Sequence, residues 1–330
     1  MKFNIRQAET DDDWDFFFKL SYETLKVLRR FIYDKLVEDN PNASDEELAK
    51  ANRKETEEYF DFKDPDSRVF IAETEEGTPC GYLWMGMRNS RDAWDIEKPQ
   101  WIYDIVVDPD YRGHGLGSKL MQKAEEFSRE MNLNLGLFVH IDNVSAIGLY
   151  KKEGYNIKNI PISKRVEVDI SNIPFEDKFT LREVQDSERE QVEQVGFQQF
   201  KEKVRFSFDV DDKEIRKLYE KHLEKLSNKE ENHQKLTAIT KNGEFAGVIW
   251  IGSSGFNEKI ASIHELAIDS QYQNGELAEF LISSAEKWVK NENFTAIYML
   301  LHATDIIDLD FFKQREYNIP GFFMEKRLKK

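Results

Sequence analysis

The sequence predicts two tandem domains of the α/β (α+β) class, each a mostly antiparallel mixed sheet flanked by helices. Three observations support this fold class. One pattern of residues occurs twice, segments with strand alternation interleave with segments of helical periodicity, and 40% of the 330 residues are hydrophobic. That length and apolar content are sufficient for a core in each half.

The internal repeat begins with a hairpin. Residues 72–86, AETEEGTPCGYLWMG, match residues 238–252, AITKNGEFAGVIWIG, with one alanine, three glycines and one tryptophan in register. Each segment has two apolar runs around a glycine turn, which is the pattern of a β-hairpin. Residues 101–111 match residues 262–272 in the same order. Repeats in one order predict a tandem of two related domains.

We place the two domains at 1–170 and 178–330. The segment SNIPFEDK at 171–178 is polar and contains a proline, so it is the natural connection between them.

The elements of the first half follow from periodicity and from the Gly, Pro and Asp residues that interrupt it. Asp11, Asp12 and Asp13 after Thr10 are typical of a helix N-terminus, where the helix dipole favours negative charge, so no cation site is needed to explain them. In order, the predicted elements are a strand at 3–8, helices at 11–37 and 45–60, hairpin strands at 67–74 and 79–88, a strand at 101–107, a helix at 115–131, a strand at 134–140, a helix at 143–153, and strands at 155–159 and 163–169.

Composition and charge exclude several classes of function. The net charge of −16, from 63 Asp and Glu against 47 Lys and Arg, argues against binding to nucleic acid or to an anionic membrane. No apolar run approaches the ~20 residues that span a bilayer, and the N-terminal residues lack the pattern of an export signal. The single cysteine, Cys80, excludes an internal disulfide and favours a reducing cytoplasm. The six histidines show no spacing of a metal site.

The clearest chemical signal lies at 105–127, IVVDPDYRGHGLGSKLMQKAEEF. A β-branched strand ends at Val107, and a helix with an apolar face begins after Gly115. The glycines between them leave backbone N–H groups exposed at the positive end of the helix, which is a typical anion site. Arg112 and Lys119 add positive charge beside it. These features together suit a diphosphate, and a glycine-rich structural turn is the alternative.

Arg112, Gly115 and Gly117 match the signature Gln/Arg-x-x-Gly-x-Gly/Ala, so the segment resembles the acetyl-CoA loop of the GCN5-related N-acetyltransferases. The order of elements over 1–170 resembles that family as well. The resemblance implies acetyl-CoA as cosubstrate and no metal, with the pantetheine arm held by backbone groups of Ile105 and Val107. It also implies a pyrophosphate site beside Arg112, built from the amides of Gly113, His114, Gly115, Leu116, Gly117 and Ser118.

A second match to the family lies at 140–155, HIDNVSAIGLYKKEGY. The resemblance identifies Asn143 with the asparagine that bonds the pantetheine arm, and Tyr150 with the tyrosine near the thioester sulfur. Asn143 also suits the N-cap of the following helix, and both roles can hold together. Tyr150 could equally be a core aromatic, but the surrounding motif favours a functional residue.

By the same resemblance, the amine attacks the thioester directly in a ternary complex, without a covalent nucleophile on the protein. Tyr150 is the candidate general acid toward the departing thiolate. Asp104 is the candidate general base, with Tyr103 on the opposite face of the strand and His140 as alternatives. An acid, Glu265, stands at the matching position of the second half, so a structural role for Asp104 stays open.

The second half departs from the signature. Glu276, Asp305 and Phe312 stand where the first half has a glycine, an asparagine and a tyrosine. A side chain in place of glycine blocks a ligand's approach to the backbone, and a carboxylate repels a diphosphate. We therefore expect no CoA binding and no catalysis there, although Gln273 and Ala278 still satisfy the two ends of the signature. The second half would instead wall the acceptor cleft, stabilise the first half or form the contact of a homodimer.

The sequence thus predicts an acetyl-CoA-dependent N-acetyltransferase with its active site in the first half. The negative charge weakly favours a cationic acceptor, which stays open among polyamines, amino sugars, amino acids and protein amino groups. Two alternatives are an acyl-CoA-binding regulatory module without turnover and an acyltransferase with a non-amine acceptor or a longer acyl chain. Intact Tyr150 and Asn143 speak against the first alternative. Five aromatic residues of the acceptor region are expected to be mostly core: Trp14, Phe17, Tyr22, Trp84 and Trp101.

Overall fold

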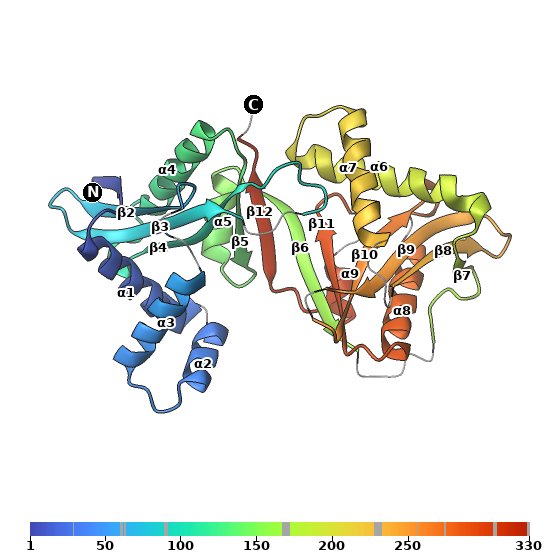
Figure 1. The fold of residues 1–330 in the computed structure, drawn as a ribbon, viewed down its shortest axis with the longest axis horizontal. Coiled ribbons are helices and arrows are strands. Elements are labelled where there is room, and N and C mark those ends of the chain that lie inside the picture. The colour runs from blue at the N-terminus through green and yellow to red at the C-terminus, as the bar shows by residue number, and fades with distance from the viewer. Residues whose placement is uncertain are drawn as a thin grey trace.

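The computed structural model describes residues 1–328, except 29, 60–61, 63, 89–91, 167–171, 228–232, 256, 274 and 306–308. Over these residues the strands form one 12-stranded sheet in the order β1-β2-β3-β4-β5-β12-β6-β11-β10-β9-β8-β7 (Figure 1). The expected mostly antiparallel mixed sheet is confirmed, since only β4–β5 and β10–β11 pair in parallel within the described chain. None of the helices in this part of the chain is long and apolar enough to cross a bilayer.

From the hairpin onward the elements follow the same order in both halves, whereas three α-helices follow β1 and η2 with two α-helices follows β7. The first half contains β1 (Phe3–Gln7), α1 (Asp11–Leu28), α2 (Arg30–Asp39), α3 (Asp45–Tyr59), β2 (Arg68–Thr74), β3 (Pro79–Met87), β4 (Gln100–Val107), η1 (Pro109–Tyr111), α4 (Leu116–Glu130), β5 (Leu135–His140), α5 (Val144–Lys152) and β6 (Asn156–Arg165). The second contains β7 (Phe179–Glu183), η2 (Asp186–Glu188), α6 (Arg189–Ser207), α7 (Asp212–Ser227), β8 (His233–Thr240), β9 (Phe245–Ser253), β10 (Ile260–Ile268), η3 (Ser270–Tyr272), α8 (Glu276–Asn291), β11 (Ala296–His302), α9 (Leu309–Gln314) and β12 (Gly321–Lys326).

Two predicted elements of the first half differ from the structure. The helix predicted over 11–37 is two helices, α1 and α2, and the strands predicted at 155–159 and 163–169 are the single strand β6. Residues 167–169 and the predicted domain end at 170 lie outside the described residues.

The final strands of the two halves are exchanged. β12, the last strand of the second half, pairs antiparallel with β5 along its whole length. β6, the last strand of the first half, pairs antiparallel with the whole of β11. Because β6 and β12 are counterparts in the repeat, each half completes the other's sheet. β12 consequently lies between β5 and β6 at the centre of the molecule (Figure 1).

A buried ion-pair cluster ties the exchanged strands together. The ammonium group of Lys158 on β6 donates to Asp95 Oδ1 at 2.5 Å and to Glu325 Oε2 of β12 at 2.7 Å. The three side chains are at most 4% exposed. Removing one partner of such a buried cluster leaves an uncompensated charge, which is strongly destabilising.

The sheet of the first half is covered on both faces, as strand alternation requires. On one face Leu83 and Met85 of β3 pack with Leu120 and Met121 of α4. On the other face the neighbouring β3 residues Tyr82 and Trp84 pack with Phe17 and Phe18 of α1. The expectation that the aromatic residues of this region are mostly core is confirmed: the buried ones are Phe17, Tyr22, Trp84 and Trp101.

The two hairpins of the internal repeat have matching backbone geometry at their glycines. A Cβ atom on Gly81 would lie 2.8 Å from the carbonyl oxygen of Val106, and one on Gly247 would lie 2.8 Å from that of Ala267. The turn glycines of the two hairpins, Gly77 and Gly243, have φ of 83° and 84°. Only glycine meets these two demands, close approach and positive φ, without strain.

Candidate active site

The site of the first half begins where the ladder between β4 and β5 ends. The two strands pair in parallel only as far as Ile102 and Leu137, although β4 continues to Val107. Backbone groups of successive strand residues point alternately to opposite sides. The N–H of Asp108 donates to β3, so the backbone groups of Val107 point away from β3, toward the side where β5 no longer pairs.

Two observations agree with this direction of the backbone. The guanidinium Nε of Arg112 donates to the carbonyl oxygen of Val107 at 3.0 Å, which places that oxygen on the open side of β4. Ile105 lies two residues earlier and shares this direction. The structure therefore brings the backbone of Ile105 and Val107 to one edge with the side chain of Arg112.

The predicted anion loop is open and its glycines are left-handed. Gly113 and Gly115 have φ of 79° and 78°, and a Cβ atom on either would meet no atom within 4 Å. Gly115 is the N-cap of α4, whose first residue Leu116 is buried in the core. Gly117 and Ser118 follow in the first turn, with their amides near the positive end of the helix. The geometry is that of an anion site with room for a ligand.

His114 lies in the same loop as an exposed side chain, and its Nδ1 is 3.4 Å from the carbonyl oxygen of Tyr111. Lys119 lies one turn into α4, with its ammonium group 5.6 Å from the centre of the Phe3 ring. Arg112 is exposed as well. Both cations that the sequence assigned to the loop are thus at the surface beside it.

A β-bulge in β4 places the candidate base. Trp84 pairs with Asp104 whereas the next residue, Met85, pairs with Ile102, so Tyr103 is the extra residue. A bulge turns two successive side chains to one face. Tyr103 packs with the cluster around α1, and the carboxylate of Asp104 accepts a hydrogen bond of 2.6 Å from the hydroxyl of Tyr82, a member of the same cluster. The expectation that Tyr103 lies on the opposite face from Asp104 is wrong, because the sequence pattern does not reveal the extra residue.

The two residues from the second motif lie on α5. Asn143 is its N-cap, and its Oδ1 accepts from the amide of Ala146 at 3.2 Å. The same oxygen also accepts from the hydroxyl of Ser145 at 3.2 Å. Tyr150 is 6% exposed and packs beside Tyr155, with ring centroids 6.2 Å apart. The structure therefore shows the capping and core roles of these residues, and their roles toward CoA stay predictions.

Other residues that the sequence singled out have local explanations. Asp13 accepts two hydrogen bonds from Arg6 and two from the amides of Glu9 and Thr10, and the pair with Arg6 holds the pKa of its carboxyl well below the usual range. Cys80 is fully buried, and burial raises the pKa of its thiol to about 11. The described residues contain no group of three His, Cys, Asp or Glu side chains suited to a metal ion.

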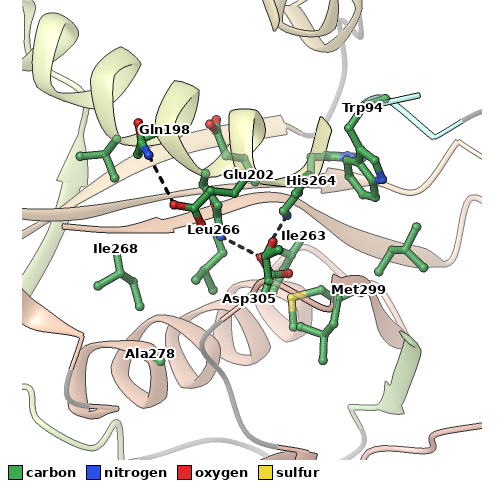
Figure 2. Close-up of a pocket in the computed structure, with 18 of the residues that line it drawn as sticks. Trp94, Gln198, Glu202, Ile263, His264, Leu266, Ile268, Ala278, Met299 and Asp305 are labelled. Atoms are coloured by element: carbon green, nitrogen blue, oxygen red, sulfur yellow. Dashed lines mark hydrogen bonds and ion pairs between the residues drawn. The ribbon is translucent and has the colours of Figure 1, made fainter. Parts of the chain in front are cut away.

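The second half has a corresponding cleft, which the sequence analysis missed. The β10–β11 ladder ends at Ile263 and Met299, and a bulge at His264 repeats the one in β4. A cavity of about 1110 Å³ lies here between β10, β11 and α6, and Figure 2 shows its lining. The start of α8 also lines it, at Gly275 and Ala278. Nothing in the repeat alignment signals this volume, because α6 and the segment at 92–94 contribute much of the wall.

The loop of the second half differs from its counterpart. α8 begins one position earlier, at Glu276, and the left-handed residue is Gly275 with φ of 88°. The carboxylate of Glu276 accepts from Lys178 at 2.7 Å. The side chain of Glu276, which we expected to disfavour a diphosphate, is thus held in place by an ion pair with Lys178.

Comparison with known proteins agrees with the resemblance. The model of the acetyltransferase (GNAT) family matches residues 29–155 and 197–317. An uncharacterised N-acetyltransferase of Methanocaldococcus jannaschii is 26% identical over 166 residues, 48% of this chain and 62% of that protein. A peptidyl-lysine N-acetyltransferase of Salmonella typhimurium is 28% identical over 134 residues, 41% of this chain and 78% of that protein. The chain therefore spans less than two thirds of the first of these relatives.

A solved structure covers nearly all of the chain. A GCN5-related N-acetyltransferase from Sphaerobacter thermophilus aligns with 99% of this chain and 96% of its own, with 14% identity and a TM-score of 0.48.

Proposed function

The chain belongs to the acetyltransferase (GNAT) family, and we propose that it is an N-acetyltransferase that uses the cleft of its first half to transfer the acetyl group of acetyl-CoA to a primary amine. The observation that carries the proposal is the open loop before α4. Gly113 and Gly115 are left-handed there, and nothing within 4 Å occupies the space that their side chains would fill.

The first half has the groups that acetyl-CoA requires. The amides from Gly113 to Ser118 would bind the pyrophosphate at the positive end of α4, with Arg112 beside them. Backbone groups of Ile105 and Val107 would hydrogen-bond the pantetheine arm where β5 no longer pairs, and the side-chain nitrogen of Asn143 would donate to it. The open side of β4 is continuous with the loop through the Arg112–Val107 hydrogen bond.

The chemistry needs an uncharged amine and a proton for the leaving group. Asp104, directly or through a water, would accept the proton of the attacking nitrogen, and the amide of Val107 would stabilise the charge on the thioester oxygen. As the C–N bond forms and the C–S bond breaks, the hydroxyl of Tyr150 would donate its proton to the thiolate. Tyr82 is a positioning residue in this scheme, since its hydroxyl fixes the carboxylate of Asp104 at 2.6 Å.

The acceptor would approach from the α1 side of the sheet, because Asp104 lies on that face. The name of the Salmonella relative adds the lysine side chain of a peptide to the candidates. A panel with a lysine peptide, spermidine, glucosamine and free amino acids therefore covers the classes that remain open.

The test follows free thiol release from acetyl-CoA with each acceptor, on the wild type and on Tyr150→Phe. Loss of a general acid should lower kcat by about a hundredfold or more. Tyr155→Phe is the matched control, since Tyr155 is a neighbouring buried tyrosine whose hydroxyl has no hydrogen-bond partner among the described residues. Absence of turnover with every amine, or equal kcat for Tyr150→Phe and wild type, would show that the proposal is wrong.

A further inference from the structure

The proposed function does not use the cavity of the second half. Its volume of about 1110 Å³ is sufficient for a small organic molecule. Its position between β10 and β11 corresponds to that of the acetyl-CoA cleft between β4 and β5. The chemistry of its lining, however, is different.

The first difference is the loss of cations at the anion site. A Cβ on Gly81 would contact Leu116, and one on Gly247 would contact Leu277, which fixes the alignment of α4 with α8. In that alignment Gln273 replaces Arg112, and Phe280 replaces Lys119. Glu276 replaces the open glycine Gly115. Each of these changes removes positive charge or adds negative charge.

The second difference is an excess of carboxylates around the cavity. Its described lining has two cations, Arg88 and Lys203, and five carboxylates, which gives a net charge of −3 with His264 neutral. The carboxylates are Asp92, Glu202, Glu265, Asp269 and Asp305. Arg88 pairs with Asp92, and Lys203 pairs with Asp305, so both cations are already neutralised.

Two of the remaining carboxylates lie at different depths of the cavity. Glu265 is the counterpart of Asp104, and its side chain is only 8% exposed. Its Oε1 accepts from the hydroxyl of Tyr219, whereas its Oε2 accepts no hydrogen bond within the described chain and lies 3.4 Å from Lys235. Glu202 on α6 is exposed and pairs with no cation among the described residues (Figure 2).

The rest of the wall is mixed. Glutamines of α6, among them Gln194, Gln198 and Gln199, give it a polar side, and the other side is apolar. Ile263, Leu266 and Met299 come from the two strands, and Phe311 comes from α9. Trp94 closes one side, and its indole nitrogen is buried without a hydrogen-bond acceptor among the described residues (Figure 2). A partly apolar wall with an excess of carboxylates suits a ligand with an apolar body and a positive charge.

We propose that this cavity binds a small organic amine, with its apolar body against Trp94 and Met299. Its ammonium group would be held by Glu202, which pairs with no cation among the described residues, together with Glu265, which already pairs with Lys235. A nucleotide diphosphate would meet like charge in the same place, so the second cleft would not duplicate the first. The proposal does not depend on acetyl transfer, because it concerns binding alone.

The test is calorimetric titration of the full chain with tryptamine and phenethylamine. Tryptophol, which has a hydroxyl in place of the amine of tryptamine, and indole-3-acetate, which is an anion, are the matched ligands. Tryptamine should bind at least tenfold more tightly than tryptophol, and indole-3-acetate should not bind. Because Trp94 lines the cavity, tryptamine binding to Trp94→Phe should also be weaker than to wild type.

Variants locate the ligand in one cleft or the other. Glu265→Gln and Glu202→Gln should each weaken tryptamine binding by about tenfold, the equivalent of about 1.4 kcal/mol. Glu190→Gln, on an exposed position of α6 outside the cavity, should not change it. Glu202 is exposed, so its variant is expected to fold even if the buried Glu265→Gln does not.

The proposal is overturned if neither amine binds, or if binding depends on Asp104 rather than on Glu265 and Glu202. It is also overturned if two molecules of acetyl-CoA bind per chain and Glu202→Gln strengthens the second, because the cavity would then be an anion site. These results are independent of the thiol-release assay, so the failure of one proposal does not decide the other.

Discussion

Gly115→Ala separates the role of the loop in binding from its role in folding. Gly115 has φ of 78°, and an added Cβ would meet no atom within 4 Å, so the protein itself presents no steric obstacle. The left-handed conformation costs an alanine about 1–2 kcal/mol. Part of this is offset because alanine lowers the entropy of the unfolded chain by the equivalent of about 0.4–1 kcal/mol. The net loss of stability should be on the order of 1 kcal/mol, or about 1–2 °C in Tm for a chain of this length.

The effect on the ligand should be larger than the effect on stability. A methyl group in the open space would move a phosphate away from the loop amides, and each hydrogen bond to a charged group contributes about 1.5–3 kcal/mol. Loss of one such bond corresponds to a Kd for acetyl-CoA about ten- to a hundredfold higher. Binding is measured by calorimetry and stability by thermal denaturation followed by circular dichroism.

Gly77→Ala is the matched control. Gly77 has φ of 83° in the turn between β2 and β3, and its Cβ would likewise meet nothing within 4 Å. The two variants should therefore lose similar stability, and only Gly115→Ala should lose affinity for acetyl-CoA. Equal affinities for acetyl-CoA in the two variants would refute the assignment of the loop.

Three further predictions concern the framework around the two clefts. Tyr82→Phe removes a hydrogen bond to the buried carboxylate of Asp104 and should lower the free energy of unfolding by about 1.5–3 kcal/mol, measured by urea denaturation. If Tyr82→Phe costs as much in the Asp104→Asn background as in the wild type, the two side chains are not energetically coupled and the prediction is wrong. Lys158→Met leaves Asp95 and Glu325 without their cation and should cost about 3–5 kcal/mol, which the same assay measures against the surface control Lys50→Met. Burial lowers the pKa of His302 to about 2, so this imidazole stays neutral in the folded protein. In the unfolded chain it takes up a proton as the pH falls below its unfolded pKa of 6.5, and the free energy of unfolding decreases over that range. Between pH 6.5 and pH 5 the wild type should lose about 2 kcal/mol more than His302→Asn, and parallel pH profiles would show that this histidine is not responsible.

The sequence was sufficient for most of the order of the elements in the first half, apart from the division of 11–37 into α1 and α2 and the single strand β6, and for the position of the glycine loop. Apolar periodicity located α4 with its buried face, including Leu120, Met121 and Ala124. Glycine spacing located the loop before α4, in which the structure shows Gly113 and Gly115 to be left-handed. Both signals are local, because they depend on the conformations that a short segment can adopt.

Non-local features could not be predicted in the same way. The sequence cannot distinguish β6 from β12 as the partner of β5, because both strands follow the same type of helix in the repeat. The bulge at Tyr103 inserts one extra residue into β4, and the residue types in that segment do not mark the insertion. The hydrogen bond between Tyr82 and Asp104 depends on that bulge, and the second cavity depends on how α6 lies over β10.

Comparison of the two halves distinguishes glycines required by the fold from those available to a ligand. Gly81 and Gly247 approach a neighbouring strand so closely that any side chain would collide with a carbonyl oxygen, and both halves retain glycine there. Gly115 has open space around it, and at its counterpart the second half carries Glu276 and still forms a helix. Packing therefore does not require glycine at that position. The left-handed residue shifts by one place in the second half. The bare loop of the first half is therefore what the proposed binding of a pyrophosphate to its amides would require.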